Sequence, residues 1–380
     1  MRLRQVVLLG FFFIVMAGVL ASQQIAAQQL PPISSAIPGV DPNYKVPRTP
    51  WGHPDLQGIY DGASMTPQAR PDKFKDRQFL TPEEVAALEK GAIDNPGRNA
   101  RAERGTHADL EGAYNDVFTH RRQNYGRTRR TGLIIDPPDG KMPALTADGQ
   151  ARQKALAARR GPRGEGPPPL GLDGKPLPYP LDTAEVKADN PEDRTPDRCS
   201  GVNVPATSSA MRLVQGPESV MMYTEYAIGG GAYRMIDLTR RTHPPASFRE
   251  KTGDSVGWWE GDTLIIETTN YSEQGGYSGA NLNLKLTERL TRVAGDLILY
   301  RITADDPTTW TKPWTVEVPV TILSNKDNQI YESACHEGNI SMTGILAGAR
   351  ALEKEAAAKA RARRIAAPAA PAVARPAQKK

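Results

Sequence analysis

The sequence predicts a mainly β protein: an antiparallel meander that closes into a barrel or a strongly curved sheet, with a few peripheral helices. Glycine (34) and proline (33) make up about a sixth of the 380 residues, above the roughly 12% of an average protein, which favours turns over long helices. From Leu282 to Thr291, leucines occupy one parity and polar residues mostly the other. A period of two is typical of a strand with one buried face.

The strands are expected in pairs joined by short turns. A short strand within Thr131–Pro143, closed by a Pro-Asp-Gly turn, precedes them. Pro319 has the parity opposite to the apolar residues of its strand, which indicates an edge or an exposed face there. The main predicted strands are Ser219–Tyr226, Ala232–Leu238, Val256–Glu260, Thr263–Thr269, Leu282–Val293, Leu297–Ala304, Trp314–Ile322 and Gln329–Ala334.

Three helices are predicted around these strands. Thr81 is placed as an N-cap before Pro82, and Glu84, three residues after the threonine, completes a capping box. This helix should end near Gly91. The stretch Ala147–Arg160 has a helical composition, and residues 346–365 form an alanine-, arginine- and lysine-rich helix.

The N-terminal residues have the pattern expected of an export signal. A cationic Met-Arg-Leu-Arg start and an apolar run from Val6 to Leu20 indicate a signal peptide over residues 1–27, with cleavage after Ala21 or Ala27. A retained anchor is the alternative, although the run is short for a ~20-residue span. We therefore expect a periplasmic or secreted protein without stable membrane insertion after cleavage. The expected parts are an extended leader (28–50), a mixed, loop-rich part packing on the sheet (51–200), a β-meander core (201–345), the helix (346–365) and a disordered tail (366–380).

Two cysteines and a small net charge restrict the function. In an oxidising compartment Cys199 and Cys335 are most simply one disulfide, and a catalytic or metal-binding thiol is the alternative. The formal charge of +5 lies largely in the C-terminal tail, so no nucleic-acid partner is expected. No cofactor or metal is expected, because the histidines show no ligand spacing. His243 lies in a basic loop and is expected to be solvated.

Several motifs, among them Trp259-Glu-Gly-Asp-Thr-Leu264 and Ala334-Cys-His-Glu-Gly-Asn339, resemble those of an uncharacterised family of exported bacterial proteins. The similarity spans roughly residues 47–352, and the closing Ala-Cys-His-Glu-Gly-Asn string is its most specific part. The resemblance implies a secreted, single-unit β protein and supplies no mechanism. The later strands also look somewhat like a lipocalin-type barrel. The motifs are Trp51-Gly52 with Pro54–Gly58, Ile135–Gly140, Trp259–Leu264 with Glu267–Asn270, Glu288-Arg289, Asp305–Pro307 with Trp310 and Pro313-Trp314, and Tyr331-Glu332 with Ala334–Asn339.

Glu288 is the strongest candidate for a functional or ion-paired residue, because it shares the parity of the leucines on its strand. A carboxylate on an apolar face must be paired or functional, since its burial alone costs several kcal/mol (roughly). The adjacent Arg289 faces the opposite side of the strand, so the expected partner is Arg301 or Arg234 from a neighbouring strand. A structural ion pair and a functional carboxylate both remain open.

Two further groups of residues could carry chemistry. A histidine beside a carboxylate, His336-Glu337, can act as a general acid or base, or can cap a turn. The pair Asp305-Asp306, in a loop near tryptophans, suits a sugar or aromatic ligand, or an Asx turn. The candidate catalytic residues are therefore His336, Glu337 and Glu288, and the candidate ligand-binding residues are Trp258, Trp259, Trp310, Trp314, Asp305, Asp306 and Arg289.

These candidates support two hypotheses. The first is an exported barrel-like protein that binds a small, partly apolar or carbohydrate ligand in a cleft lined by aromatic residues. The alternative is a hydrolase or lyase that uses His336 and Glu337, with Glu288 or the Asp305-Asp306 pair, as acid–base groups. An envelope interaction protein has only the basic tail in its favour. The sequence leaves the oligomeric state open.

Overall fold

The computed structural model describes residues 30–94, 124–160, 198–199, 205, 210–225, 232–323, 330 and 335–366. The chain divides into two units, Met1–Ile33 and Ser34–Lys380, and the second contains the sheet. The predicted signal peptide, His107 and His120 lie outside the described residues, as do most of the predicted strand Gln329–Ala334 and of the C-terminal tail.

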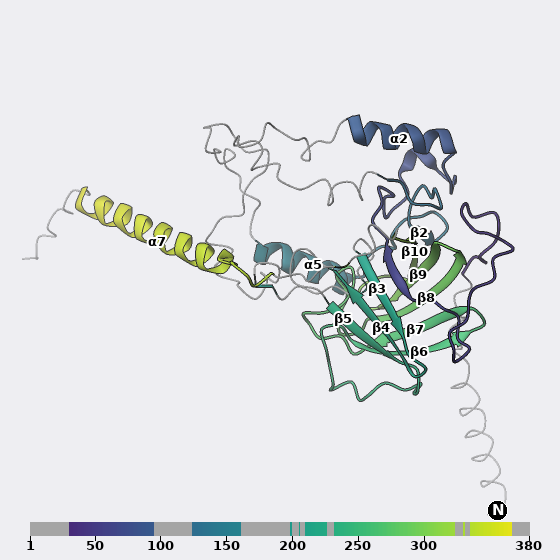
Figure 1. Cartoon of the computed structure of the whole chain (residues 1–380). Coiled ribbons are helices and arrows are strands. Elements are labelled where there is room, and N and C mark those ends of the chain that lie inside the picture. Colours follow the sequence, from purple (N-terminus) through teal and green to yellow (C-terminus); the bar gives the residue numbers. More distant parts are fainter. Residues whose placement is uncertain are drawn as a thin grey trace, which may run out of the picture. The chain divides into compact units, whose positions relative to one another are not determined.

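Nine strands form a closed, mixed, largely antiparallel barrel, as the sequence predicts (Figure 1). Closure comes from the N-terminal strand β1 (Gly58–Asp61), which pairs with β3 on one side and, through Tyr60 and Asp61, with β10 on the other. The remaining barrel strands are β3 (Ala210–Gln215), β4 (Ser219–Thr224), β5 (Ala232–Asp237), β6 (Asp254–Glu260), β7 (Thr263–Thr269), β8 (Lys285–Ala294), β9 (Leu297–Asp305) and β10 (Trp314–Ile322).

The junction between β5 and β6 is a weak seam in the barrel wall. Strands β5 and β6 run parallel and share a single register pair, Asp237 with Val256, whereas β6 through β10 form long antiparallel ladders. A tenth strand, β2 (Ile134–Asp136), adds to β10 outside the closed ring. The barrel is therefore held least by backbone hydrogen bonds between β5 and β6.

The interior of the barrel is a packed core built by strict alternation. On β8, β9 and β10 the even-numbered side chains point inward, so the predicted leucine parity of β8 is confirmed. Each fully buried large apolar side chain stabilises the fold by about 1.5–3 kcal/mol. These inward side chains are Leu286, Glu288 and Leu290, then Ile298, Tyr300, Ile302 and Ala304, then Trp314, Val316, Val318 and Val320.

Pro319 meets one of the two alternatives expected from the sequence, a local edge, and not the other, an exposed face. It is buried rather than exposed, and it pairs with Leu299 of β9. On the other side of β10, pairing with β2 ends at Val316 and pairing with β1 begins at Thr321, so Pro319 lies between the two ladders. Gly126 covers it closely, since a Cβ at that position would lie 3.0 Å from the proline Cγ.

Helices α2 (Pro82–Asp94), α5 (Ala147–Arg160) and α7 (Ser341–Ala366) and a short 3₁₀ helix η1 (Asp72–Phe74) complete the described elements. The predicted capping box opens α2: the Thr81 amide donates to Glu84 Oε2 at 2.8 Å, and the Glu84 amide donates to Thr81 Oγ1 at 3.2 Å. The helix runs past Gly91. Within the described residues no helix is long and apolar enough to cross a membrane.

Cys199 and Cys335 form the disulfide that the sequence predicts, with their Cα atoms 5.6 Å apart. The bond links positions 136 residues apart, on either side of the stretch that contains strands β3 to β10. Closing so long a loop removes conformational entropy from the unfolded chain.

We predict that replacing both cysteines by serine lowers the free energy of unfolding by about 4–5 kcal/mol, because the unfolded chain regains that entropy. Denaturant unfolding of the oxidised protein and of the double variant measures the difference. Alkylation with mass analysis is the control, and two free thiols in the unreduced protein would contradict the pairing.

Candidate functional site

A buried ion pair lies at the centre of the barrel. Glu288 of β8 is 0% exposed, and its carboxylate faces the guanidinium of Arg234 from β5. Two parallel hydrogen bonds join them, from Nη1 to Oε1 at 2.6 Å and from Nη2 to Oε2 at 2.7 Å. The predicted burial of Glu288 is confirmed, and of the two expected partners Arg234 is the one that binds it.

Hydroxyl groups complete the shell around this pair. The Tyr300 hydroxyl donates to Glu288 Oε2, Thr268 donates to Oε1 at 3.4 Å, and Arg234 Nη1 also donates to Thr268 Oγ1 at 3.1 Å. Burial, and next the charge of Glu288, raise the pKa of Tyr300 well above its ordinary value. Burial opposes the charge on Arg234, but Glu288 raises its pKa overall. Tyr300 therefore stays a donor and Arg234 a cation.

An aromatic cluster lies beside the pair. The rings of Trp310 and Trp314 meet edge to face at 5.4 Å, and Tyr277 stacks on Trp314 at 5.8 Å. Both tryptophans are at most 1% exposed, yet in the described part of the chain neither indole Nε1 has a hydrogen-bond partner. Burial, and next the charge of Glu288, raise the pKa of Tyr277 to about 12, so its hydroxyl is protonated at neutral pH.

Residues that are direct partners across neighbouring strands form rows on the inner face of the barrel, and Trp314 lies in the row next to that of Glu288. Glu288 pairs with Ile302, which pairs with Val316. The neighbouring inward row starts at Trp314 and continues through three small side chains and one leucine. Its members are Trp314, Ala304, Leu286, Thr268 and Ser255.

A second polar cluster lies on the outer face of β6 and β7. His243 is 15% exposed: its Nδ1 lies 2.6 Å from Asp254 Oδ2 and its Nε2 lies 3.3 Å from Glu267 Oε1. Arg240 binds Asp254 with two nitrogens, at 2.6 and 3.0 Å, and Lys285 binds Glu267 at 2.5 Å. The expectation that His243 is solvated is therefore wrong, because outward carboxylates on two adjacent strands hold its ring.

This cluster perturbs Asp254. Burial favours the neutral acid, but the hydrogen bonds and charges of Arg240 and His243 outweigh it and lower the pKa of Asp254 below its ordinary value. Among the described residues no group of three or more histidine, cysteine, aspartate and glutamate side chains is arranged to hold a metal ion.

A third charged cluster lies on the outer face of β8, β9 and β10. Arg301 does not pair with Glu288; it binds Glu317 at 2.8 Å, and Arg130 binds the other oxygen of Glu317 at 2.6 Å. Arg289 is the register partner of Arg301 and is half-buried.

The two aspartates of the predicted ligand loop, Asp305 and Asp306, make different contacts. Asp306 is 3% exposed and accepts hydrogen bonds from the Thr308 amide and from the hydroxyls of Thr308 and Thr309 at 2.7–2.9 Å. This is the turn-forming alternative. Asp305 is the register partner of Lys285. Burial raises the pKa of Asp305, against the opposing charge of Lys285.

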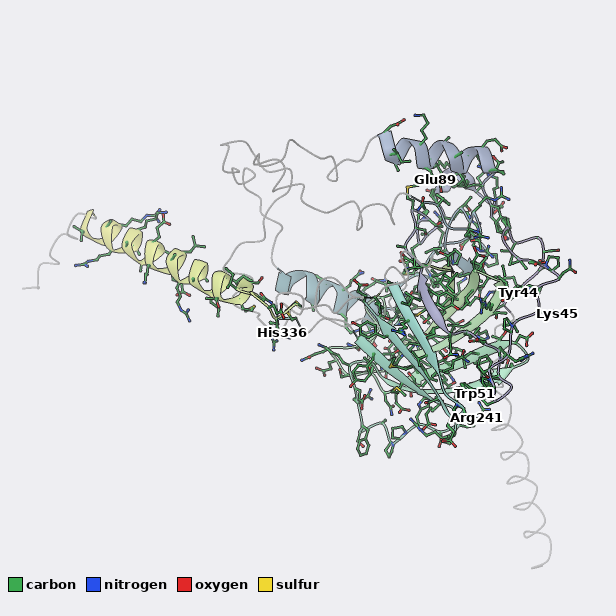
Figure 2. The ribbon with its side chains drawn as sticks, in the orientation of Figure 1. Tyr44, Lys45, Trp51, Glu89, Arg241 and His336 are labelled. Atoms are coloured by element: carbon green, nitrogen blue, oxygen red, sulfur yellow. A yellow bond between two sulfur atoms is a disulfide. The ribbon has the colours of Figure 1, made fainter. Side chains whose placement is uncertain are left out.

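The structure does not bring the predicted acid–base residues together. His336 and Glu337 are exposed, before the start of α7 (Figure 2), and the Asn339 amide donates to the His336 carbonyl in a turn. In the described parts of the chain no hydrogen bond or ion pair joins either residue to Glu288 or Asp305.

The adjacent tryptophans of β6 face opposite sides of the barrel wall. Trp259 points inward, 5.3 Å from the ring of His53. Trp258 points outward, donates to Glu260 at 2.8 Å and lies 4.9 Å from the guanidinium of Arg241, which Figure 2 labels. The predicted tryptophans thus occupy separate places, and only Trp310 and Trp314 form one cluster.

Sequence reasoning missed Tyr300 and Tyr277. Tyr300 has the parity of Ile298 and Ile302, so the rule that identified Glu288 could also have found Tyr300. Tyr277 lies in an irregular segment between β7 and β8, where no periodicity marks it.

Comparison with protein-family models, curated proteins and solved structures found no match to this chain. The barrel that the pattern of strands predicted is present. Membership of the exported family stays a prediction.

We predict that Glu288→Gln lowers the free energy of unfolding by about 3–5 kcal/mol, because Arg234 is left as an unpaired buried cation. Denaturant unfolding measures the loss. The matched control replaces both partners by apolar residues (Arg234→Met with Glu288→Leu) and should recover most of the stability. A Glu288→Gln protein as stable as the parent would contradict a structural role.

We predict that Asp254→Asn destabilises the protein at neutral pH and that the difference from the parent disappears in acid. A carboxyl group with a lowered folded pKa contributes its full stability above its unfolded pKa, ordinarily 3.8, and loses it as the pH falls through the folded value. Melting temperatures across the acid range test this. Asp262→Asn, at an exposed pair with Arg48, is the control and should change little. A pH-independent difference would contradict the prediction.

Proposed function

We propose that the barrel binds a small, partly apolar ligand with oxygen acceptors, such as a carbohydrate or an aryl glycoside, against Trp310, Trp314 and Tyr277. The observation that carries this proposal is that, within the described residues, the buried N–H groups of the neighbouring indoles Trp310 and Trp314 have no hydrogen-bond partner; Trp259, elsewhere in the barrel, is the third such indole. A ligand oxygen would satisfy such a donor, and the rings offer apolar faces for stacking.

Energetics support a ligand at this position. A buried donor without a partner costs about 1–3 kcal/mol, and more than nine in ten buried polar groups in proteins are satisfied. Two such donors lie on rings 5.4 Å apart, beside a row that includes alanine, threonine and serine. Donors without acceptors favour a ligand that presents oxygen lone pairs.

The ion pair is the polar boundary of this region. Both oxygens of Glu288 accept hydrogen bonds from Arg234, and one also accepts from Tyr300. Both oxygens of this carboxylate are therefore held by donors of the barrel itself, and the carboxylate orients these neighbours. The geometry therefore favours binding over the acid–base alternative.

The expected location is the periplasm or the outside of the cell. The Cys199–Cys335 disulfide fits an oxidising compartment, as does the apolar N-terminal run. Soluble glycosides and aromatic compounds reach such a compartment.

We predict that Trp314→Phe weakens the binding of p-nitrophenyl glucoside, which joins an apolar ring to sugar hydroxyls, by about 2- to 10-fold through loss of one hydrogen bond. Isothermal titration measures the affinity. Release of nitrophenolate tests the hydrolase alternative in the same samples.

Trp258→Phe is the matched control, since this indole lies on the outer face and already donates to Glu260. The control should bind as the parent does. Equal affinity in the parent and in Trp314→Phe would contradict the proposal, and nitrophenolate release that depends on Glu288 would favour the enzyme.

A further inference from the structure

We propose that the outer wall of the barrel carries an oxyanion site centred on Arg289, distinct from the interior site, which takes the carboxylate or phosphate group of a small molecule. The site lies on the outer faces of β8 and β9. It goes beyond the ligand binding proposed above and does not depend on it.

The register brings like charges together there. Arg289 and Arg301 are direct partners across β8 and β9, and Arg301 is the direct partner of Glu317 on β10. Like charges opposite each other in an antiparallel pair are destabilising. A strand pair that keeps two facing arginines therefore gains from an anion between or beside them.

The carboxylate in this row is already committed. Both oxygens of the fully buried Glu317 accept from other arginines, Oε1 from Arg130 and Oε2 from Arg301. The row thus contains two guanidinium groups and one carboxylate, and Arg130 brings a third guanidinium group to that carboxylate from outside the row. Within the described residues Arg289 makes no ion pair, and Glu260, the acidic group whose charge acts on it, accepts from Trp258.

The burial and the neighbours of Arg289 also favour the binding of an anion. Partial burial lowers the pKa of Arg289; the charge of Glu260 opposes this effect, and the charge of Arg301 adds to it. A bound anion would favour the charged guanidinium. The side chain is half-buried, so an ion can reach it while bulk water screens it less. Thr287 and Thr291 flank it on the same face and are half-buried. The Thr287 hydroxyl can donate to an anion, whereas the Thr291 hydroxyl is hydrogen-bonded to that of Thr263 at 2.8 Å.

The test uses inorganic phosphate and glucuronate as probes of the two chemistries. Isothermal titration of the full chain should show saturable binding, and Arg289→Gln should weaken it by about tenfold or more, the effect of losing one hydrogen bond to a charged group. Arg212→Gln is the matched control: it removes an exposed outward arginine of β3 whose register partners are Ile59 and Tyr223. The probe that binds more tightly identifies the class of anion.

Thermal stability separates binding from a structural role. Without added anion, Arg289→Gln should melt at or above the parent temperature, because it removes a like-charge neighbour of Arg301. With phosphate or glucuronate, the parent should gain melting temperature and the variant should not. The proposal is overturned if neither probe binds the parent, if Arg289→Gln and Arg212→Gln respond alike, or if Arg289→Gln melts lower in the absence of anion.

Discussion

The bidentate pair of Arg234 and Glu288 is the interaction on which the barrel depends. Neither charge could lie in the core without the other, because a single buried ion costs several kcal/mol (roughly) even after relaxation. The pair also spans the weakest part of the wall: Arg234 belongs to β5 and Glu288 to β8, on either side of the β5–β6 seam with its single register pair. A one-residue slip of either strand would turn its charge to the outer face, so the pair fixes the register across that seam.

The outer face repeats this logic with two further networks that fasten covering segments to the wall. Glu317 binds Arg130, which follows the segment that covers Pro319. The proline is accommodated in a long strand because it lies in the gap between the ladders with β2 and β1, where no amide donor is required. Asp254 and Glu267 hold His243, from the loop between β5 and β6. Ion pairs on both faces of the barrel wall thus hold together segments that are not joined by the hydrogen bonds of a β-ladder.

The two proposed sites differ in the way that their surroundings dictate. Inside, neutral indole donors lie in an apolar region beside a neutralised ion pair, which suits an uncharged oxygen-bearing ligand. Outside, Arg289 makes no ion pair with any described residue and lies half-buried opposite Arg301, which suits an anion. A sugar or aromatic group suits only the interior site, and an acid group suits only the outer site. The two sites lie on opposite faces of the barrel wall, so they can be tested independently.

The sequence by itself determined the elements and their buried faces, because alternation, caps and turns are local. The helix over Ala147–Arg160, the capping box at Thr81, the inward parity of Glu288 and the disulfide could all be predicted. Only the tertiary structure decided which elements became neighbours. Closure of the barrel by β1, the choice of Arg234 over Arg301, the capture of His243 and the separation of the candidate tryptophans all depend on strand order and register between distant segments. The two-residue alternation of a strand predicts whether a side chain points into or out of the barrel. It carries no information about which residue from another strand will contact that side chain.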